Sequence, residues 1–142
     1  SYGTIGWLPD LKPWAIMIAE RLKPGGVFYI AEFHPVVWMF NDDFTHIQYS
    51  YENREVFVTE NQGTYTFRYA IIKGKEYSCN HSISEVLNTL IDAGLRIQFF
   101  NEYMYSPYPC FRNVVESEPG KWHIKGLEGK IPMVYSLMAI KQ

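Results

Sequence analysis

Cysteine is scarce in this 142-residue sequence, in which Cys79 and Cys110 are the only two. They form no C-x-x-C pair, which argues against a disulfide framework and a zinc site, so we expect no metal. Apolar runs such as Ala15–Ala19 are far too short to cross a bilayer, and no membrane partner is expected. Thirteen basic residues against fifteen acidic ones leave a net charge of −2, which provides no basic surface for nucleic acid. We therefore expect a protein of the reducing cytoplasm.

The length and apolar content fit one globular domain or a piece of one. Hydrophobic residues make up 47% of the chain and charged residues 20%, a balance that supports a packed core and argues against disorder. The sequence opens at Ser1 without an initiator methionine, which fits either a trimmed start or a fragment cut inside a larger domain. Composition leaves both alternatives open.

The clearest local pattern is a helix, a double-glycine turn and a strand. Apolar residues recur at helical spacing and predict a helix over Leu11–Leu22. After the turn, Val27–Ala31 is an apolar run without alternation, which is typical of a strand buried on both faces of a parallel sheet. Glu32 and His34 follow at the carboxyl end of this strand. Ligands of open α/β sheets bind outside the carboxyl ends of the strands, so this is a candidate site.

The middle of the chain changes character. Alternating, aromatic and β-branched residues predict strands at Ile47–Tyr51, Val56–Val58 and Tyr65–Tyr69. The polar segment Glu60–Gly63 predicts a turn between the last two. We therefore expect a small antiparallel β insert at residues 44–73.

The last third of the chain predicts one helix and two strands. Ser82–Glu85 is a capping box that opens a helix, and Gly94 closes it. Strands are predicted at Arg96–Phe100 and Val134–Ile140, with loops over residues 101–132 between them. Because no helix separates these strands, they can pair antiparallel.

These segments together resemble the C-terminal portion of a class I S-adenosylmethionine-dependent methyltransferase. Leu22–Glu32 matches the L-K-P-G-G turn and fifth strand of that family, and Ser1–Asp10 resembles the segment after its fourth strand. His81–Leu95 resembles its last helix. Arg96–Phe100 and Val134–Ile140 correspond to strands six and seven, the reversed strands that distinguish the fold of that family.

The resemblance implies an α/β fold: a partial Rossmann-like methyltransferase sheet, made of strands five to seven with an antiparallel C-terminal hairpin, plus the small β insert. Residues 1–142 are then a single domain that forms the C-terminal part of a larger one. The family grips its cofactor largely through a glycine-rich loop, yet no two glycines here are separated by a single residue. The N-terminal glycine-rich cofactor motif is therefore lacking from this sequence.

Two functions follow as expectations. In the first, the chain is the substrate-side half of an enzyme that moves a methyl group from S-adenosylmethionine to a small molecule, and it is inactive without a missing N-terminal half. In the second, it is a non-enzymatic α/β interaction module that forms a homodimer through an open sheet edge.

Three residues are candidates for catalysis. Glu32 and His34 form the preferred polar pair, in which His34 can act as a base because its ordinary pKa lies near neutrality. His81 precedes a helix N-terminus and can reach the same site as a neutral acceptor. The alternatives are structural: Glu32 caps loop amides, His34 is a surface histidine, and His81 belongs to a capping loop.

The resemblance places the cofactor near the start of the chain. Ser1, Tyr2 and Gly3 correspond to the end of strand four, where carbonyls and an aromatic face suit a sulfonium cation. Trp7 can cover the cofactor or serve only in packing. Aromatic residues of the insert and of the loop after strand six are expected to line a site for a flat or apolar acceptor, or else simply to fill a thin core.

Overall fold

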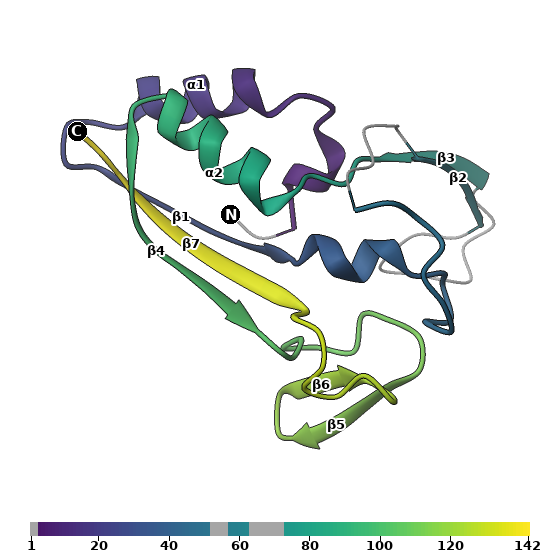
Figure 1. Cartoon of the computed structure of the whole chain (residues 1–142). Coiled ribbons are helices and arrows are strands. Elements are labelled where there is room, and N and C mark those ends of the chain that lie inside the picture. The colour runs from purple at the N-terminus through teal and green to yellow at the C-terminus, as the bar shows by residue number, and fades with distance from the viewer. Residues whose placement is uncertain (1–2, 52–56, 63–72) are drawn as a thin grey trace.

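The computed structural model describes residues 3–51, 57–62 and 73–142. Its main sheet has three strands, β1 (Val27–Phe33), β7 (Val134–Lys141) and β4 (Leu95–Tyr103), in the order β1-β7-β4. The central strand β7 runs antiparallel to both neighbours, so β1 and β4 run in the same direction. The sheet and its two helices form an α/β fold (Figure 1).

The chain connections explain these directions. Between β1 and β4 the chain crosses over through helix α2 (Ile83–Asp92), and a crossover of this kind returns the second strand parallel to the first. Between β4 and β7 no helix intervenes, so β7 comes back antiparallel. Pairing of the last two strands is thus confirmed. Of the two strands expected to be reversed, only β7 runs against β1 within the described residues, because β7 inserts between β1 and β4.

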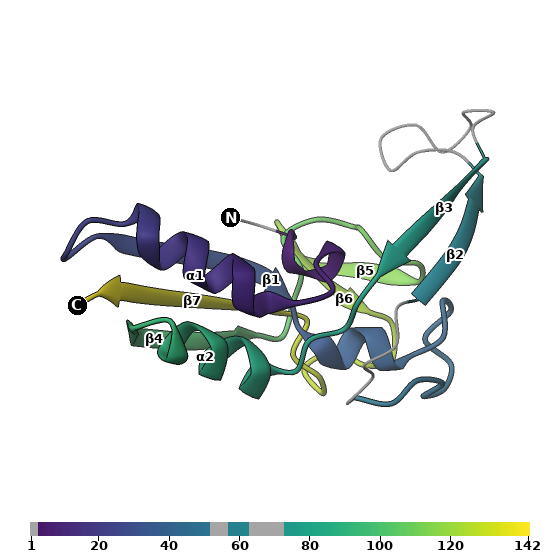
Figure 2. The same ribbon diagram turned by 90° about the horizontal axis from the view of Figure 1, so that it is seen from above.

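Both long helices cover the same face of the sheet. Helix α1 (Leu11–Arg21) lies along β1, and α2 lies along β4 (Figure 2). Asp10 accepts a hydrogen bond from the Lys12 amide at 2.9 Å and caps α1. Ser82 accepts one from the Glu85 amide at 3.2 Å and caps α2. Within the described residues, no helix is long and apolar enough to cross a membrane.

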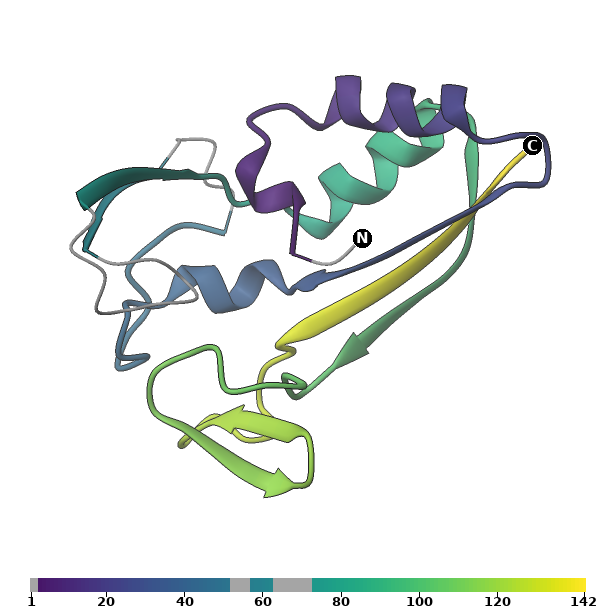
Figure 3. The same cartoon turned by 180° about the vertical axis from the view of Figure 1, so that it is seen from behind.

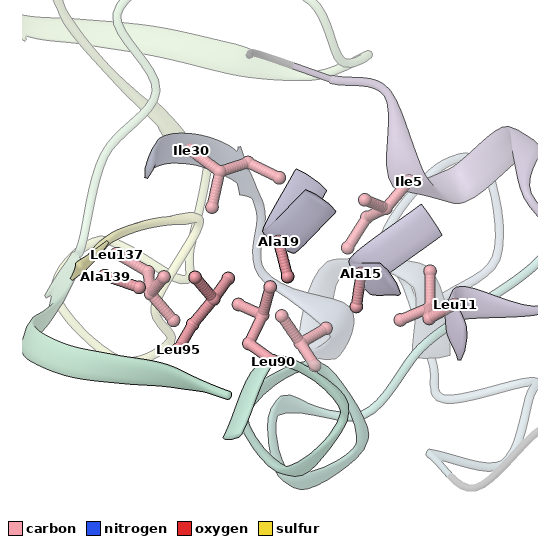
Figure 4. Close-up of a cluster of buried hydrophobic side chains, with 10 residues drawn as sticks. Ile5, Leu11, Ala15, Ala19, Ile30, Leu90, Leu95, Leu137 and Ala139 are labelled. Carbon is pink, nitrogen blue, oxygen red and sulfur yellow. The ribbon is translucent and has the colours of Figure 1, made fainter. Parts of the chain in front are cut away.

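The main core fills the space between the helices and the sheet. Its buried side chains point toward one another from both layers (Figure 4); they include Leu11, Ala15 and Ala19 of α1, Leu90 of α2, and Ile30, Leu95, Leu137 and Ala139 of the sheet. Because Ala15 and Ala19 have small side chains, α1 can lie close to the rest of the core. The opposite face of the sheet carries neither α1 nor α2 (Figure 3). Consequently Val27 of β1 is 53% exposed, and the expected burial of this strand on both faces is wrong.

Two further hairpins extend from the sheet. β2 (Phe57–Gln62) pairs antiparallel with β3 (Lys73–Ser78), which confirms a small extra sheet in or beside the predicted insert. The turn predicted at Glu60–Gly63 is wrong, since its first three residues continue β2. Ile47–Tyr51 forms no strand, and Ile47 makes only an isolated bridge to Phe40.

The rest of the predicted insert falls largely outside the described residues. Tyr65–Tyr69 lies there entirely, as does Val56. The second hairpin, β5 (Val114–Glu118) with β6 (Lys121–Ile124), occupies a region predicted as loop. Sequence reasoning missed it because β5 has only five residues, of which two are valines, so it carries little apolar signal.

Candidate functional site

Glu32 stands at the carboxyl end of β1, buried under the N-terminal turn of the chain. Its Oε1 accepts hydrogen bonds from the Thr4 amide at 2.7 Å, the Thr4 hydroxyl at 3.1 Å and the Ile5 amide at 3.3 Å. Three donors on one buried carboxylate oxygen hold the turn in place. These contacts match the structural alternative for Glu32, the capping of loop amides. A catalytic role for Glu32 stays a prediction.

The same turn is tied down at two other points. The Gly3 amide donates to the Ala31 carbonyl at 3.2 Å, and the Cys79 amide donates to the Gly6 carbonyl at 2.7 Å. The turn includes the short 3-10 helix η1 (Ile5–Trp7), and it lies between the helices and the carboxyl end of β1 (Figure 1). β1, the turn and the segment before α2 therefore meet at one place.

His34 is buried directly after β1, so the prediction that it could be a surface histidine is wrong. Its Nδ1 accepts a hydrogen bond from the Val36 amide at 3.2 Å, which leaves the proton of the neutral ring on Nε2. Nε2 lies 2.9 Å from Glu102 Oε1, as a close approach and not as a well-directed hydrogen bond. Burial lowers the pKa of His34, and the neighbouring Glu102 carboxylate opposes this shift only in part.

Glu102 and Tyr135 join this site from the two other strands. The register places Glu32 of β1 opposite Tyr135 of β7, and Tyr135 opposite Glu102 of β4. The His34 and Tyr135 rings meet edge to face with centroids 6.3 Å apart. We call Glu32, His34, Glu102 and Tyr135 the polar cluster. It continues the helix-covered face of the sheet beyond the apolar row of Ile30 and Leu137.

Tyr135 is the most buried member of the polar cluster, with 1% of its surface exposed. Its ring stacks on Phe100 at a centroid distance of 5.3 Å. Burial, together with the nearby Glu32 carboxylate, raises the pKa of Tyr135 far above its ordinary value, so the hydroxyl keeps its proton. Glu102, by contrast, has a side chain that is 45% exposed and connects the cluster to solvent.

His81 lies at the N-terminus of α2 and contacts two oxygen acceptors. Its Nε2 lies 2.7 Å from the Leu8 carbonyl oxygen, and its Nδ1 lies 3.1 Å from Glu85 Oε1. Both ring nitrogens thus lie within hydrogen-bond distance of an oxygen of the protein, and which of them donates depends on the tautomer. The contacts join the N-terminal turn to α2, and a catalytic role for His81 stays a prediction.

The residues predicted for the cofactor are described in part. Ser1 and Tyr2 lie outside the described residues. Gly3 has φ +63°, and nothing lies within 4 Å of the position that a Cβ would take. Trp7 is 56% exposed, so it has not been absorbed into the core. An open glycine and an exposed indole fit the methyl-donor end of S-adenosylmethionine, because backbone can approach a ligand at the first and a cation can lie on the second.

The aromatic residues near the end of β1 pack mainly on one another. Phe33 meets Trp38 at 5.8 Å and Phe111 at 5.0 Å between ring centroids, and Phe44 meets Phe111 at 5.4 Å. Phe33, Phe44 and Phe111 belong to a second apolar cluster around Val37 and Met133. This supports the alternative that aromatics fill a thin core, at least for these rings. Among the residues that the structure describes, no three His, Cys, Asp or Glu side chains group as metal ligands would.

No family model matches the sequence, and no curated protein matches it significantly. Solved structures do match the fold. A candidate S-adenosylmethionine-dependent methyltransferase from Listeria monocytogenes superposes with a TM-score of 0.62 at 17% identity, over 100% of this chain and 59% of that one. The chain has the fold of the C-terminal portion of an S-adenosylmethionine-dependent methyltransferase.

Two further methyltransferase structures show the same likeness. The enzyme from Mesorhizobium loti has a TM-score of 0.52 at 12% identity, over 99% of this chain and 60% of that one. The one from Methanosarcina mazei has a TM-score of 0.53 at 16% identity, over 99% and 57%. This methyltransferase-like chain thus spans about 60% of the length of the structures that it matches.

Sequence reasoning missed two members of the polar cluster. Glu102 lies two residues past the predicted end of its strand, and nothing in the sequence near it marks a site. Tyr135 reads as one more aromatic residue in an apolar strand. Its pairing opposite Glu32 is the informative signal, and that pairing depends on β7 lying between β1 and β4.

Proposed function

We propose that this chain supplies the substrate-facing part of an enzyme that transfers a methyl group from S-adenosylmethionine to a small molecule. The observation that carries the proposal is the position of the polar cluster within a methyltransferase-like sheet. The cluster lies at the carboxyl ends of β1 and β4, where α/β sheets bind their ligands. We place the protein in the cytoplasm, where its two cysteines, both free in the structure, stay reduced.

S-adenosylmethionine supplies an electrophilic methyl group when it is bound. Gly3 and Trp7 are the described residues that we assign to its methyl-donor end. Glu32 contributes indirectly, since it fixes the turn that carries both residues. Transfer between two bound molecules depends chiefly on their relative position, so a rigid turn beside a rigid sheet suits the reaction.

The nucleotide end of the cofactor needs groups that we do not assign to this chain. The sequence has no G-x-G, so we expect the chain alone to be inactive and to require an N-terminal half or a partner chain. The test is a calorimetric titration with S-adenosylhomocysteine of the 142-residue chain and of the protein translated from any extended reading frame. Binding by the longer protein, weakened by Gly3→Ala, supports the proposal.

A second function has one specific observation in its favour. Among the described residues β1 pairs only with β7, which leaves its other edge open apart from the hydrogen bond from Gly3 to Ala31. Val27 on this strand is exposed. An open edge with an exposed apolar residue is a template for strand pairing, so the chain would act as a module that dimerises through β1.

A further inference from the structure

Two buried polar atoms of the polar cluster lack a well-directed hydrogen bond within the described part of the chain. Tyr135 Oη has no partner there, and His34 Nε2 has only the poorly directed Glu102 Oε1 at 2.9 Å. Buried hydroxyl and ring N–H groups normally have a hydrogen-bond partner, because a group that loses its hydrogen bonds to water and gains none in the protein destabilises the fold. An unpaired hydroxyl beside a poorly paired ring N–H points to a ligand that would satisfy both groups.

The protonation of the cluster limits what this ligand can be. His34 Nδ1 accepts from the Val36 amide, so Nε2 offers only a proton. An ammonium group offers only protons as well, so it cannot accept the hydrogen bond that the His34 Nε2–H donates. A carboxylate or phosphate would lie beside the carboxylates of Glu32 and Glu102, which repel it. A neutral hydroxyl meets neither obstacle, since it both accepts and donates.

We propose that Tyr135 and His34 bind the hydroxyl group of a small molecule, with Glu102 accepting the hydrogen bond that this hydroxyl donates. Glu102 is suited to this role because its carboxylate already approaches His34 Nε2 at 2.9 Å and its side chain reaches solvent. Phe100, stacked on the Tyr135 ring, provides an apolar neighbour for the body of the ligand. The site deepens the proposed function, under which the hydroxyl-bearing molecule is the methyl acceptor.

The proposal predicts that removing the Tyr135 hydroxyl weakens ligand binding but does not lower the stability of the unliganded protein. Its hydroxyl has no partner in the unliganded protein, so Tyr135→Phe removes an unpaired buried group and leaves the unfolding midpoint unchanged or higher. Tyr103→Phe is the matched control on the adjacent strand. The Tyr103 hydroxyl lies 3.1 Å from Ser136 Oγ, so its loss lowers the midpoint. A Tyr135→Phe midpoint that falls as far as that of Tyr103→Phe overturns the proposal.

Binding is measured with phenol as the probe and toluene as its hydroxyl-free analogue, on protein labelled with carbon-13 at the tyrosine Cζ. No cofactor is present, so the result is independent of the S-adenosylhomocysteine titration. We expect phenol to shift the Tyr135 signal saturably and to bind at least about fivefold more weakly to Tyr135→Phe, with Tyr103→Phe unchanged. Toluene binding as tightly as phenol, or a Tyr135 signal that phenol does not move, overturns the proposal.

Discussion

Glu32 Oε1 accepts a hydrogen bond from the Thr4 amide at 2.7 Å, across 28 positions of sequence. This contact joins the end of β1 to the turn that carries Gly3 and Trp7. The same oxygen also accepts from the Thr4 hydroxyl and the Ile5 amide. The buried carboxylate thus sets the position of the residues assigned to the cofactor.

Replacing Glu32 therefore destabilises the protein. Glu32→Ala leaves buried donors unpaired and should lower the free energy of unfolding by about 3 kcal/mol. Glu32→Gln keeps an acceptor oxygen without the charge and should cost about 1 kcal/mol. Urea denaturation measures both. Glu118→Ala, which breaks only the exposed pair with Lys121, is the control and should have no measurable effect. An equally small effect for Glu32→Ala would contradict the anchoring role.

His34 should make stability depend on pH. Burial holds its pKa below the ordinary 6.5, so the unfolded chain binds the proton more readily than the folded one. The neutral ring's contribution is complete above pH 6.5 and is lost as the pH falls through the lower folded pKa. Glu102, Tyr135 and, beyond Tyr135, Glu32 are the titratable groups packed around the ring, and Glu102 limits the shift.

The measurement compares urea denaturation of the wild type and His34→Gln from pH 7.5 to 5.5. The wild type should lose more stability than the variant as the pH falls, because only the wild type carries the depressed histidine. His46, His81 and His123 are present in both proteins and cancel. Two parallel curves would show that His34 protonates as easily in the folded state as in the unfolded one.

The cap of α1 gives a local test of the helix that covers β1. Asp10→Ala removes the side-chain acceptor of the Lys12 amide and should lower the free energy of unfolding by about 1 kcal/mol. Asp10→Asn keeps an acceptor oxygen and should cost much less. Thermal unfolding of the three proteins makes the comparison, and equal losses for both variants would mean that the charge of Asp10 matters and its hydrogen bond does not.

Self-association distinguishes the interaction module from the enzyme part. If copies pair through the edge of β1, the wild-type chain sediments as a dimer or larger species, and Val27→Lys returns it to 16.6 kDa. Ile91→Lys on α2 is the matched control, since Ile91 is 52% exposed against 53% for Val27, and it should leave association intact. A wild-type chain that sediments sharply as a monomer rules out this mode of dimerisation.

The sequence predicted the elements whose signals are local. Asp10, the apolar spacing of α1 and the Ser82 cap mark helices that the structure confirms nearly to the residue. The short strands were harder, because β5 carries few apolar residues and β2 runs through polar positions that resemble a turn. For these strands the local sequence pattern is too weak to predict their bounds.

The sequence predicted only those members of the polar cluster that lie at the end of a single strand. Glu32 lies at the carboxyl end of β1 and His34 directly follows the strand, so chain order is enough to place them together. Tyr135 and Glu102 reach the same point from β7 and β4, about a hundred and about seventy positions later along the chain. Only strand order and register bring them there, and these depend on packing between distant segments.

The central claim is that this chain forms part of an S-adenosylmethionine site. It is tested most directly by calorimetric titration with S-adenosylhomocysteine, applied to the 142-residue chain, to any longer protein that contains it, and to the Gly3→Ala variant of that protein. We predict binding by the longer protein, weakened by Gly3→Ala, and none by the short chain. Binding by neither protein would contradict the claim and leave the methyltransferase-like fold without its cofactor.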